Sequence, residues 1–437
     1  DTRLMPHATL PSDPLPAGNL PNCALPGTPL ADSLPGINAC VHCGFCLQAC
    51  PTYTVHDDEN DSPRGRIFLM RSLLEGTVTT DDPDVNEHID RCLGCRACET
   101  ACPSGVPYGQ LLEATRATLA IGRSKPLLAK IILGVFRRPW LLKPAMFASR
   151  LLAATPIPTL FAKTPGRFGF AMAMLASTTR GLEPGGYKAT GNGKRGSAAV
   201  LLGCVMEGLF TDTNRATERV LVVNDYDLKS APGQRCCGAL HAHAGDLEGA
   251  KHLARINIAA FEKSGADFIA VNAAGCGAIM KEYGHLLRDD PGWNERAAAT
   301  AARVRDISEL LAAAGPKPGG ALPVLVTYDA PCHLHHAQRI TQAPLSVLAA
   351  IPALELAPLH DSDRCCGAAG IYNLIEPETS NLVLDEKLAN VRDTRASFIA
   401  TGNPGCMMQI GAGLIRDESA MRAIHPVDLL DASYAAS

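Results

Sequence analysis

The chain has 437 residues, enough for two or three domains, and a formal net charge of −4 at pH 7. It has no Lys/Arg-rich tract, which argues against a nucleic-acid-binding protein. No uninterrupted apolar run reaches the roughly 18 residues needed to cross a bilayer, so no transmembrane helix is predicted. The 17 cysteines mostly lie in repeated patterns. This is typical of metal ligation in a reducing compartment rather than of a disulfide framework.

Residues 1–36 are rich in proline and have little periodicity, which predicts a flexible leader. Cys23 in this segment belongs to no pattern, and we interpret it as an inert thiol. The segment lacks a charged region followed by an apolar one, so no secretory signal is expected.

The next segment, 37–120, contains two runs with the spacing Cys-x2-Cys-x2-Cys-x3-Cys-Pro. This bacterial-ferredoxin spacing holds a cubane 4Fe–4S cluster, and its occurrence twice predicts two clusters. In two-cluster ferredoxins the fourth cysteine of each run ligates the other run's cluster. Zinc also binds four cysteines, but usually as two separated pairs, so iron–sulfur is favoured. The predicted ligands are Cys40, Cys43, Cys46 and Cys102 for the first cluster, and Cys92, Cys95, Cys98 and Cys50 for the second.

The two runs are separated by a long insert, residues 52–91. Residues 64–74 within it, and 103–120 after the second run, have apolar residues at helical spacing. Helices between and after the motifs predict an α-helical ferredoxin domain rather than the small β-hairpin type.

Residues 121–195 form an apolar connector with scattered Arg and Lys and several prolines. Such a segment could lie in a membrane interface, with Trp140 and the basic residues at the level of the headgroups. The alternative, which we favour from sequence, is that it packs on the rest of the protein or on a partner subunit.

The remainder of the chain repeats one pattern, first in residues 196–318 and again in 319–437. Each copy has the order strand, Cys, helix, Cys-Cys-Gly, helix, strand, Cys. Alternating strands and helices predict parallel sheets with helices on both faces, and so an α+β multidomain chain. Ligands of such sheets gather at the carboxyl ends of the strands, where several of these cysteines would lie. The candidate metal ligands are Cys204, Cys236, Cys237 and Cys276 in the first copy, and Cys332, Cys365, Cys366 and Cys406 in the second.

From about residue 38 onwards, the chain resembles the iron–sulfur subunits of bacterial glycolate oxidase. Beyond the cysteine spacing, the resemblance rests on CVHCGFC at 40–46, SPRGR at 62–66, CETACPSGV at 98–106, AGCGA at 274–278 with KEYG at 281–284, and Pro331-Cys332 with His336-Ala337-Gln338.

This resemblance implies an electron-transfer subunit of a flavin-dependent glycolate dehydrogenase complex. FAD-binding partner subunits would oxidise the 2-hydroxy acid, and this chain would pass the electrons through two 4Fe–4S clusters towards quinone. The chain would then have no flavin and no catalytic residue of its own, and would lie in the cytoplasm, peripherally associated with the inner membrane. The sequence agrees in lacking a strand-linked Gly-x-Gly-x-x-Gly turn and a Walker loop.

Other functions remain open from sequence. The chain could be the equivalent subunit of a D-lactate, glycerol-3-phosphate or heterodisulfide oxidoreductase. A redox-sensing iron–sulfur protein is an alternative of another class, although the sequence offers no helix-turn-helix or basic face for binding DNA.

The Cys-Cys-Gly repeats also resemble those of the heterodisulfide reductases, which hold non-cubane clusters. The fuller motif ends in Cys-x-x-Cys, whereas this chain has Ile279 and Gln409 at the last position. One ligand is therefore missing from each repeat. The repeats could hold an iron–sulfur centre, zinc or no metal.

Three residues near the repeats are candidates for a quinone site: His243, His336 and Tyr372. The two histidines match positions associated with the family, and a His or Tyr can hydrogen-bond and protonate a reduced quinone oxygen. Ordinary surface or capping roles are the alternative for each. His42, between two cluster ligands, is expected to tune a cluster rather than to bind it.

Overall fold

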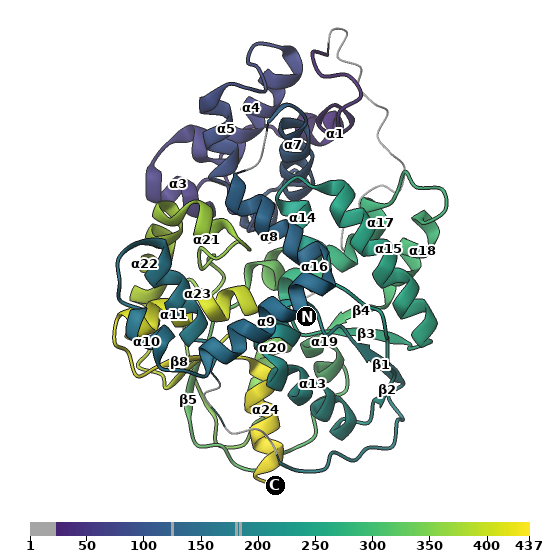
Figure 1. Cartoon of the computed structure of the whole chain (residues 1–437), viewed down its shortest axis with the longest axis vertical. Coiled ribbons are helices and arrows are strands. Elements are labelled where there is room, and N and C mark those ends of the chain that lie inside the picture. Colours follow the sequence, from purple (N-terminus) through teal and green to yellow (C-terminus); the bar gives the residue numbers. More distant parts are fainter. Residues whose placement is uncertain (1–22, 124–125, 180–181, 183–185) are drawn as a thin grey trace, which may run out of the picture.

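The computed structural model describes residues 23–123, 126–179, 182 and 186–437. Figure 1 shows a helical N-terminal part at the top of the view and two α/β units side by side below it. Most of the predicted leader lies outside the described residues. Its last part does not continue as a leader, because two short helices begin at Pro29 and Leu34.

The N-terminal part is helical throughout, as the spacing of its apolar residues predicts. Its elements are α1 (Pro29–Asp32), α2 (Leu34–Asn38), α3 (Pro51–His56), η1 (Glu59–Asp61), α4 (Pro63–Glu75), α5 (Pro83–Asp90), α6 (Ala97–Thr100) and α7 (Tyr108–Gly122). Leu30 and Ile37 are fully buried in one core with residues of α4 and α7, which explains why ordered structure begins before residue 37.

Helix α4 illustrates how this sequence sets its local structure. Ser62 caps the helix by accepting a hydrogen bond from the Gly65 amide, and Pro63 occupies the first turn, where no amide donor is needed. The helix ends at Gly76, which has a φ of 74°. The buried face of α4 includes Arg66, which reaches towards the thiols described below.

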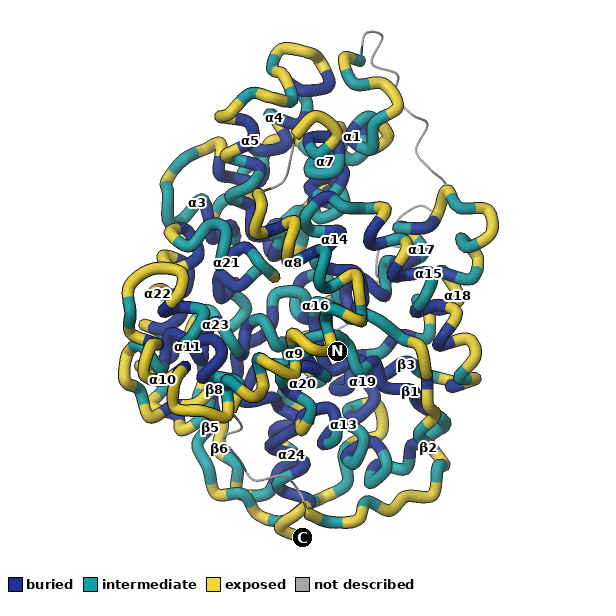
Figure 2. Tube along the Cα trace, in the orientation of Figure 1, coloured by how far each residue is buried: buried dark blue, intermediate teal, exposed yellow. Residues whose placement is uncertain are grey.

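The connector folds into four helices: α8 (Leu127–Arg137), α9 (Pro139–Ala153), α10 (Ile157–Phe161) and α11 (Gly166–Ala176). The inner sides pack on both α/β units, since α9 contacts α12 of the first and α11 contacts α23 of the second. Their other sides remain exposed, as Figure 2 shows along α8, α9 and α10. No helix among the described residues is long and apolar enough to cross a membrane.

The first α/β unit contains β1 (Ser197–Val200), α12 (Val205–Leu209), α13 (Thr211–Val223), β2 (Asp227–Leu228), α14 (Ala239–His243), α15 (Leu247–Ser264), β3 (Phe268–Val271), α16 (Ala274–Lys281), α17 (Tyr283–Leu286), α18 (Asn294–Arg303), β4 (Val304–Asp306) and α19 (Ile307–Ala312). The second contains β5 (Leu325–Tyr328), η2 (His333–Ala337), α20 (Ala343–Ala349), β6 (Glu355–Ala357), α21 (Tyr372–Ile375), α22 (Pro377–Asp393), β7 (Phe398–Ala400), α23 (Pro404–Arg416), β8 (Arg422–Ile424) and α24 (Pro426–Ala435).

Both units have the same sheet topology. The strand orders are β2-β1-β3-β4 and β6-β5-β7-β8, and every pairing is parallel. The parallel sheets predicted for the two repeats are therefore present. In each unit the two central strands lead into the segments that carry the first and last cysteines of the pattern.

Each unit has a helix that packs against a helix of the other unit. Helix α24 of the second unit packs on α13 of the first, and α19 of the first packs on α20 of the second. Arg219 on α13 forms an ion pair with the buried Asp431 on α24, at 2.6 Å. A single hydrophobic core spans both sheets, so the repeats form one body with approximate two-fold symmetry.

Candidate functional site: two thiol cavities and a shared cleft

The first thiol cavity lies at the loop that follows α2. It is lined by Cys40, Cys43, Cys46 and Cys102, together with Cys98. Gly44 lies inside this loop with a φ of +86°, and a Cβ atom there would approach Arg64 Nη1 to 2.9 Å. Glycine is thus favoured by the backbone conformation, whereas the Arg64 side chain could move to make room for a Cβ atom. Three cysteines of the first run and the last of the second surround one space.

The second thiol cavity is more deeply buried. It is lined by Cys50, Cys92, Cys95 and Cys98. The last cysteine of the first run therefore lies with the first three of the second. Cys98 lines both cavities, so the two spaces are neighbours.

Buried polar groups surround the second cavity. The guanidinium of Arg66, fully buried, forms an ion pair with the equally buried Asp61 at 3.0 Å. Its Nη1 lies 4.0 Å from Cys50 Sγ, and the Tyr108 hydroxyl lies 3.6 Å from Cys92 Sγ. These donors face the sulfur atoms, which is the arrangement that stabilises ligating thiolates.

The donor sets match the predicted group, because four thiols around a compact space suit a cubane cluster. Burial raises the pKa of Cys46 to about 11. Burial and the neighbouring thiols raise the pKa of Cys98 as well. Thiols in such surroundings stay protonated without a cation, so metal binding would release protons.

The cysteines of each α/β unit also gather into one set. In the first unit the sulfurs of Cys204 and Cys236 lie 3.4 Å apart, and those of Cys237 and Cys276 lie 3.1 Å apart. The second unit repeats the pairing, with Cys332 in contact with Cys365, and Cys366 in contact with Cys406. Four thiols per unit could hold zinc or an iron–sulfur centre.

The positions where the fuller motif has a fifth cysteine serve packing instead. Ile279 is buried in the core of the first unit. Gln409, fully buried, donates to Ser380 Oγ at 2.9 Å and accepts from Asn373 Nδ2 at 2.8 Å. Neither side chain offers a sulfur ligand, so each unit brings four thiols together.

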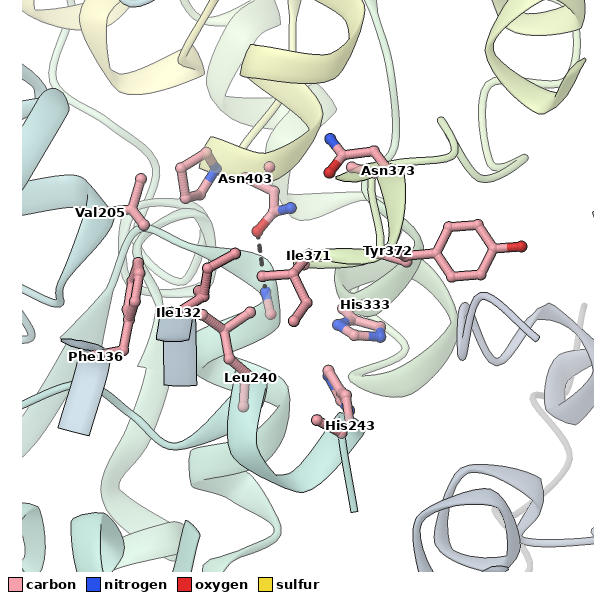
Figure 3. Close-up of a pocket in the computed structure, with 18 of the residues that line it drawn as sticks. Ile132, Phe136, Val205, Leu240, His243, His333, Ile371, Tyr372, Asn373 and Asn403 are labelled. Carbon is pink, nitrogen blue, oxygen red and sulfur yellow. Dashed lines mark hydrogen bonds between the residues drawn. The ribbon is translucent and has the colours of Figure 1, made fainter. Parts of the chain in front are cut away.

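A cleft of about 480 Å³ lies between the two units and beneath the connector helices. Its walls include all eight cysteines of the repeats and Cys92 of the N-terminal part. Figure 3 shows Ile132 and Phe136 of α8 on one side, with Val205, Leu240 and Ile371 nearby. The cleft is therefore mainly apolar, with the thiols of both repeats in its walls.

Two of the three candidate quinone residues line this cleft, and one does not. His243 and Tyr372 are in its wall, although the Tyr372 hydroxyl is bonded to the Arg91 carbonyl at 2.8 Å. His336 lies outside the lining, because its ring nitrogens bond Thr100 Oγ1 and the Asp363 carbonyl, each at 3.0 Å. His336 is therefore outside this cleft, and its assignment to a quinone site stays a prediction.

The sequence offered little reason to choose His333, which does line the cleft. Its ring centroid lies 5.2 Å from that of His243, and the two rings face each other in Figure 3. Its Nε2 donates to the Gly94 carbonyl at 3.0 Å, and burial lowers its pKa to about 3. Its place beside Cys332 was the one available signal, but three histidines follow that cysteine and the pattern could not rank them.

The N-terminal part contacts both α/β units around the cleft. On the second unit, Cys95 of the second cavity contacts Cys365. On the first, Arg116 joins the two parts, donating to the carbonyls of His243 at 2.9 Å and Cys92 at 2.6 Å. The cysteine loops of the N-terminal part are therefore in direct contact with both repeats.

A helical domain with two adjacent four-thiol sets, joined to a duplicated cysteine-rich α/β unit, defines an iron–sulfur protein of the electron-transfer class. The 4Fe-4S dicluster domain family matches residues 36–106, and the cysteine-rich domain family matches residues 198–281 and 326–411.

The chain belongs to the family of glycolate oxidase iron–sulfur subunits. It is 38% identical over 420 residues to the probable glycolate oxidase iron-sulfur subunit of Bacillus subtilis, with 90% of this chain and 92% of the relative covered. It is 34% identical over 389 residues to the glycolate oxidase iron-sulfur subunit of Escherichia coli, with 87% and 91% covered. The resemblance read from the sequence is confirmed.

Two further comparisons reach less far. Lactate utilization protein A of Geobacillus thermodenitrificans is 28% identical over 230 residues, which is 52% of this chain and 95% of that protein. The crystal structure of a hypothetical protein from Helicobacter pylori has a TM-score of 0.51 at 8% identity, covering 89% of this chain and 71% of that one. The second likeness concerns the fold alone.

Proposed function

We propose that this iron–sulfur subunit relays electrons from FAD-binding partner subunits, which oxidise glycolate, through two 4Fe–4S clusters towards quinone. The first cluster is held by Cys40, Cys43, Cys46 and Cys102, and the second by Cys92, Cys95, Cys98 and Cys50. One observation carries the proposal: each crosswise set of four thiols surrounds its own cavity, and the two cavities are neighbours. Clusters in this arrangement accept and donate single electrons.

The exposure of the two cavities suggests a direction for the electrons. The first loop is at the surface, where Cys43 is exposed and Phe45 has 70% of its area accessible. Exposed apolar side chains beside a redox centre suit the docking of a partner. The second cavity is buried against Cys365 of the second repeat. Electrons would arrive at the first cluster and leave from the second towards the cleft.

The repeats offer further metal sites. Their two four-thiol sets suit zinc or an iron–sulfur centre equally well in donor chemistry. Metal analysis of the purified protein separates these cases. More than eight irons would indicate iron in the repeats, and stoichiometric zinc would indicate a structural role.

The substrate of the complex is a second question. Similarity to lactate utilization proteins over half of the chain favours lactate as the alternative 2-hydroxy acid. Turnover of glycolate and of D- and L-lactate by the whole complex, with quinone as acceptor, would decide between them.

The crosswise ligation predicts which cluster each cysteine supports. Protein purified without oxygen should contain about eight irons from the two cubanes. Cys50→Ala should damage the cluster held by Cys92, Cys95 and Cys98, while the signal of the other cluster persists in EPR spectra after reduction. Cys23→Ala, outside both cavities, is the control and should keep all iron. Loss of the other signal instead would refute the crosswise assignment, and an iron content near four would remove one cluster.

The connector is proposed as the membrane-docking face of the subunit. Ten large apolar residues of α8–α11 are exposed, including Trp140 and Leu160 with 70% and 74% of their area accessible. No Asp or Glu occurs between Glu113 and Glu183, while Lys and Arg recur along the segment. An apolar face with basic residues and no acidic ones complements an anionic lipid surface.

A further inference from the structure

The wall of the cleft between the repeats includes a histidine, His243, with a ring nitrogen that no described residue satisfies. His243 Nδ1 lies 2.9 Å from Glu113 Oε1, whereas its Nε2 is enclosed and has no hydrogen-bond partner within the described part of the chain. A buried polar atom without a partner is costly, so such an atom in the wall of a cleft is a candidate for hydrogen bonding to a bound molecule.

Glu113 determines what His243 can offer to that ligand. Burial would raise the pKa of Glu113, but the hydrogen bond from His243 and the charge of that ring outweigh it and lower the pKa. An ionised carboxylate can only accept, so His243 Nδ1 carries a proton. Nε2 is then a donor when the ring is charged and an acceptor when it is neutral. One atom can bind either a carbonyl or a hydroxyl.

The rest of the cleft suits a flat apolar ring. Leu240, Ile371 and Phe136 surround the space in front of the two histidines (Figure 3). The volume of about 480 Å³ is within the range of small-molecule sites. The thiols of both repeats and Cys92 are in the same walls, so a ligand here would lie beside the candidate metal sites.

Helix α8 connects the cleft with the proposed membrane-docking face. Helix α8 turns Ala129, Ile132 and Phe136 towards the cleft, and exposes Leu127 and Ile131 on its other side. Helix α8 is therefore both a wall of the cleft and part of the proposed membrane-docking face of the connector. A lipophilic molecule held at the proposed membrane-docking face would therefore lie next to the cleft.

We infer that this cleft binds the head group of a lipophilic quinone, with His243 Nε2 hydrogen-bonded to one of the quinone oxygens. A quinone carries carbonyl oxygens when oxidised and hydroxyls when reduced, which match the two states of that nitrogen. The inference rests on the proposed function, since it places the acceptor of the relay in a specific part of the chain.

The test measures binding separately from turnover. The full chain, purified with its metal content intact, is titrated with menadione by equilibrium dialysis, and labelled with a photoreactive azido-naphthoquinone. Saturable binding is expected, with label on α8, α14 and residues 369–375. His243→Ala should weaken menadione binding about tenfold, and Phe136→Trp should weaken it by narrowing the space in front of the histidines. His360→Ala, on an exposed loop, is the matched control and should bind normally.

Two results would overturn the inference: unchanged binding in both His243→Ala and Phe136→Trp, or label confined to residues outside the cleft. EPR of the reduced samples keeps this failure apart from failure of the proposed function. If both variants keep the EPR signals of the two clusters and bind menadione normally, the cleft is not the quinone site, but the proposed electron relay is unaffected. Absent clusters would refute the relay, whatever the binding data show.

Discussion

The glycine of each Cys-Cys-Gly pattern shows how a single residue shapes the thiol sets. Gly238 and Gly367 have φ values of 94° and 84°, in the left-handed region that side chains disfavour. A Cβ on Gly367 would also lie 2.5 Å from the Ser380 carbonyl oxygen. Which cysteines lie together was predictable from their spacing along the chain, because that spacing is typical of metal ligation. The role of His333 was not, since it depends on residues about 90 and 240 positions away.

Replacing Gly367 by Ala should lower the stability of the second unit by about 3 kcal/mol, because left-handed strain adds to the clash with Ser380. Gly315→Ala is the control, since Gly315 has a φ of +69° but open space around it. Only the strain of about 1 kcal/mol applies there. Thermal unfolding followed by circular dichroism measures both. Equal losses in the two variants would show that the contact with Ser380 has no effect.

At the scale of elements, the strands were predictable from the sequence, but which side of each connector helix is buried was not. The repeated order of strands, helices and cysteines predicted the four strands that precede single cysteines, which the structure has as β1, β3, β5 and β7. The connector is apolar on most sides, so its sequence pattern could not separate packing from lipid contact. Helix α8 has a buried and an exposed apolar side: Ala129 and Leu133 are buried, while Leu127 and Ile131 are exposed.

The exposed face of the connector predicts selective binding to anionic vesicles. The protein should sediment with phosphatidylglycerol vesicles, less with phosphatidylcholine, and less at high salt. Trp140→Glu with Leu160→Glu should reduce this binding at least tenfold by placing acidic groups in the apolar face. Phe68→Glu, at an exposed aromatic residue of α4, is the control. If the double variant binds vesicles normally but no longer binds the flavin subunits, the face is a protein interface instead.

At the scale of the whole molecule, the two α/β units depend on each other. The repeat predicted two similar units, but their reciprocal packing could not be predicted, because it joins residues more than 200 positions apart, such as Thr213 and Asp428. His425 lies in the same interface between the two α/β units. Its Nδ1 accepts from the Val427 amide, so its Nε2 donates to the Asn272 carbonyl of the first unit at 2.9 Å.

Acidic pH should destabilise this interface between the two units. Burial lowers the pKa of His425 from 6.5 to about 4, so the folded chain requires the neutral ring. The contribution is fully present above pH 6.5 and is lost as the pH falls towards 4, with a size on the order of 3 kcal/mol. His425→Gln keeps an amide donor for Asn272 but does not titrate. Its unfolding temperature should therefore fall less than that of the parent between pH 6.5 and 4.5, whereas His360→Gln should follow the parent.

The position of the N-terminal part across both units has one more consequence. Glu113 and Arg96 hold the first unit through His243 and Glu282, and Arg91 and His56 hold the second through Tyr372 and Thr379. Arg91 and Arg96 flank cysteines of the second run, while His56 and Glu113 lie on α3 and α7, the helices that follow the two runs. Chelation that strips iron should therefore loosen the N-terminal part from both units and make the chain an easier target for proteases. The supply of iron would then determine the lifetime of the subunit against proteolysis as well as its ability to transfer electrons.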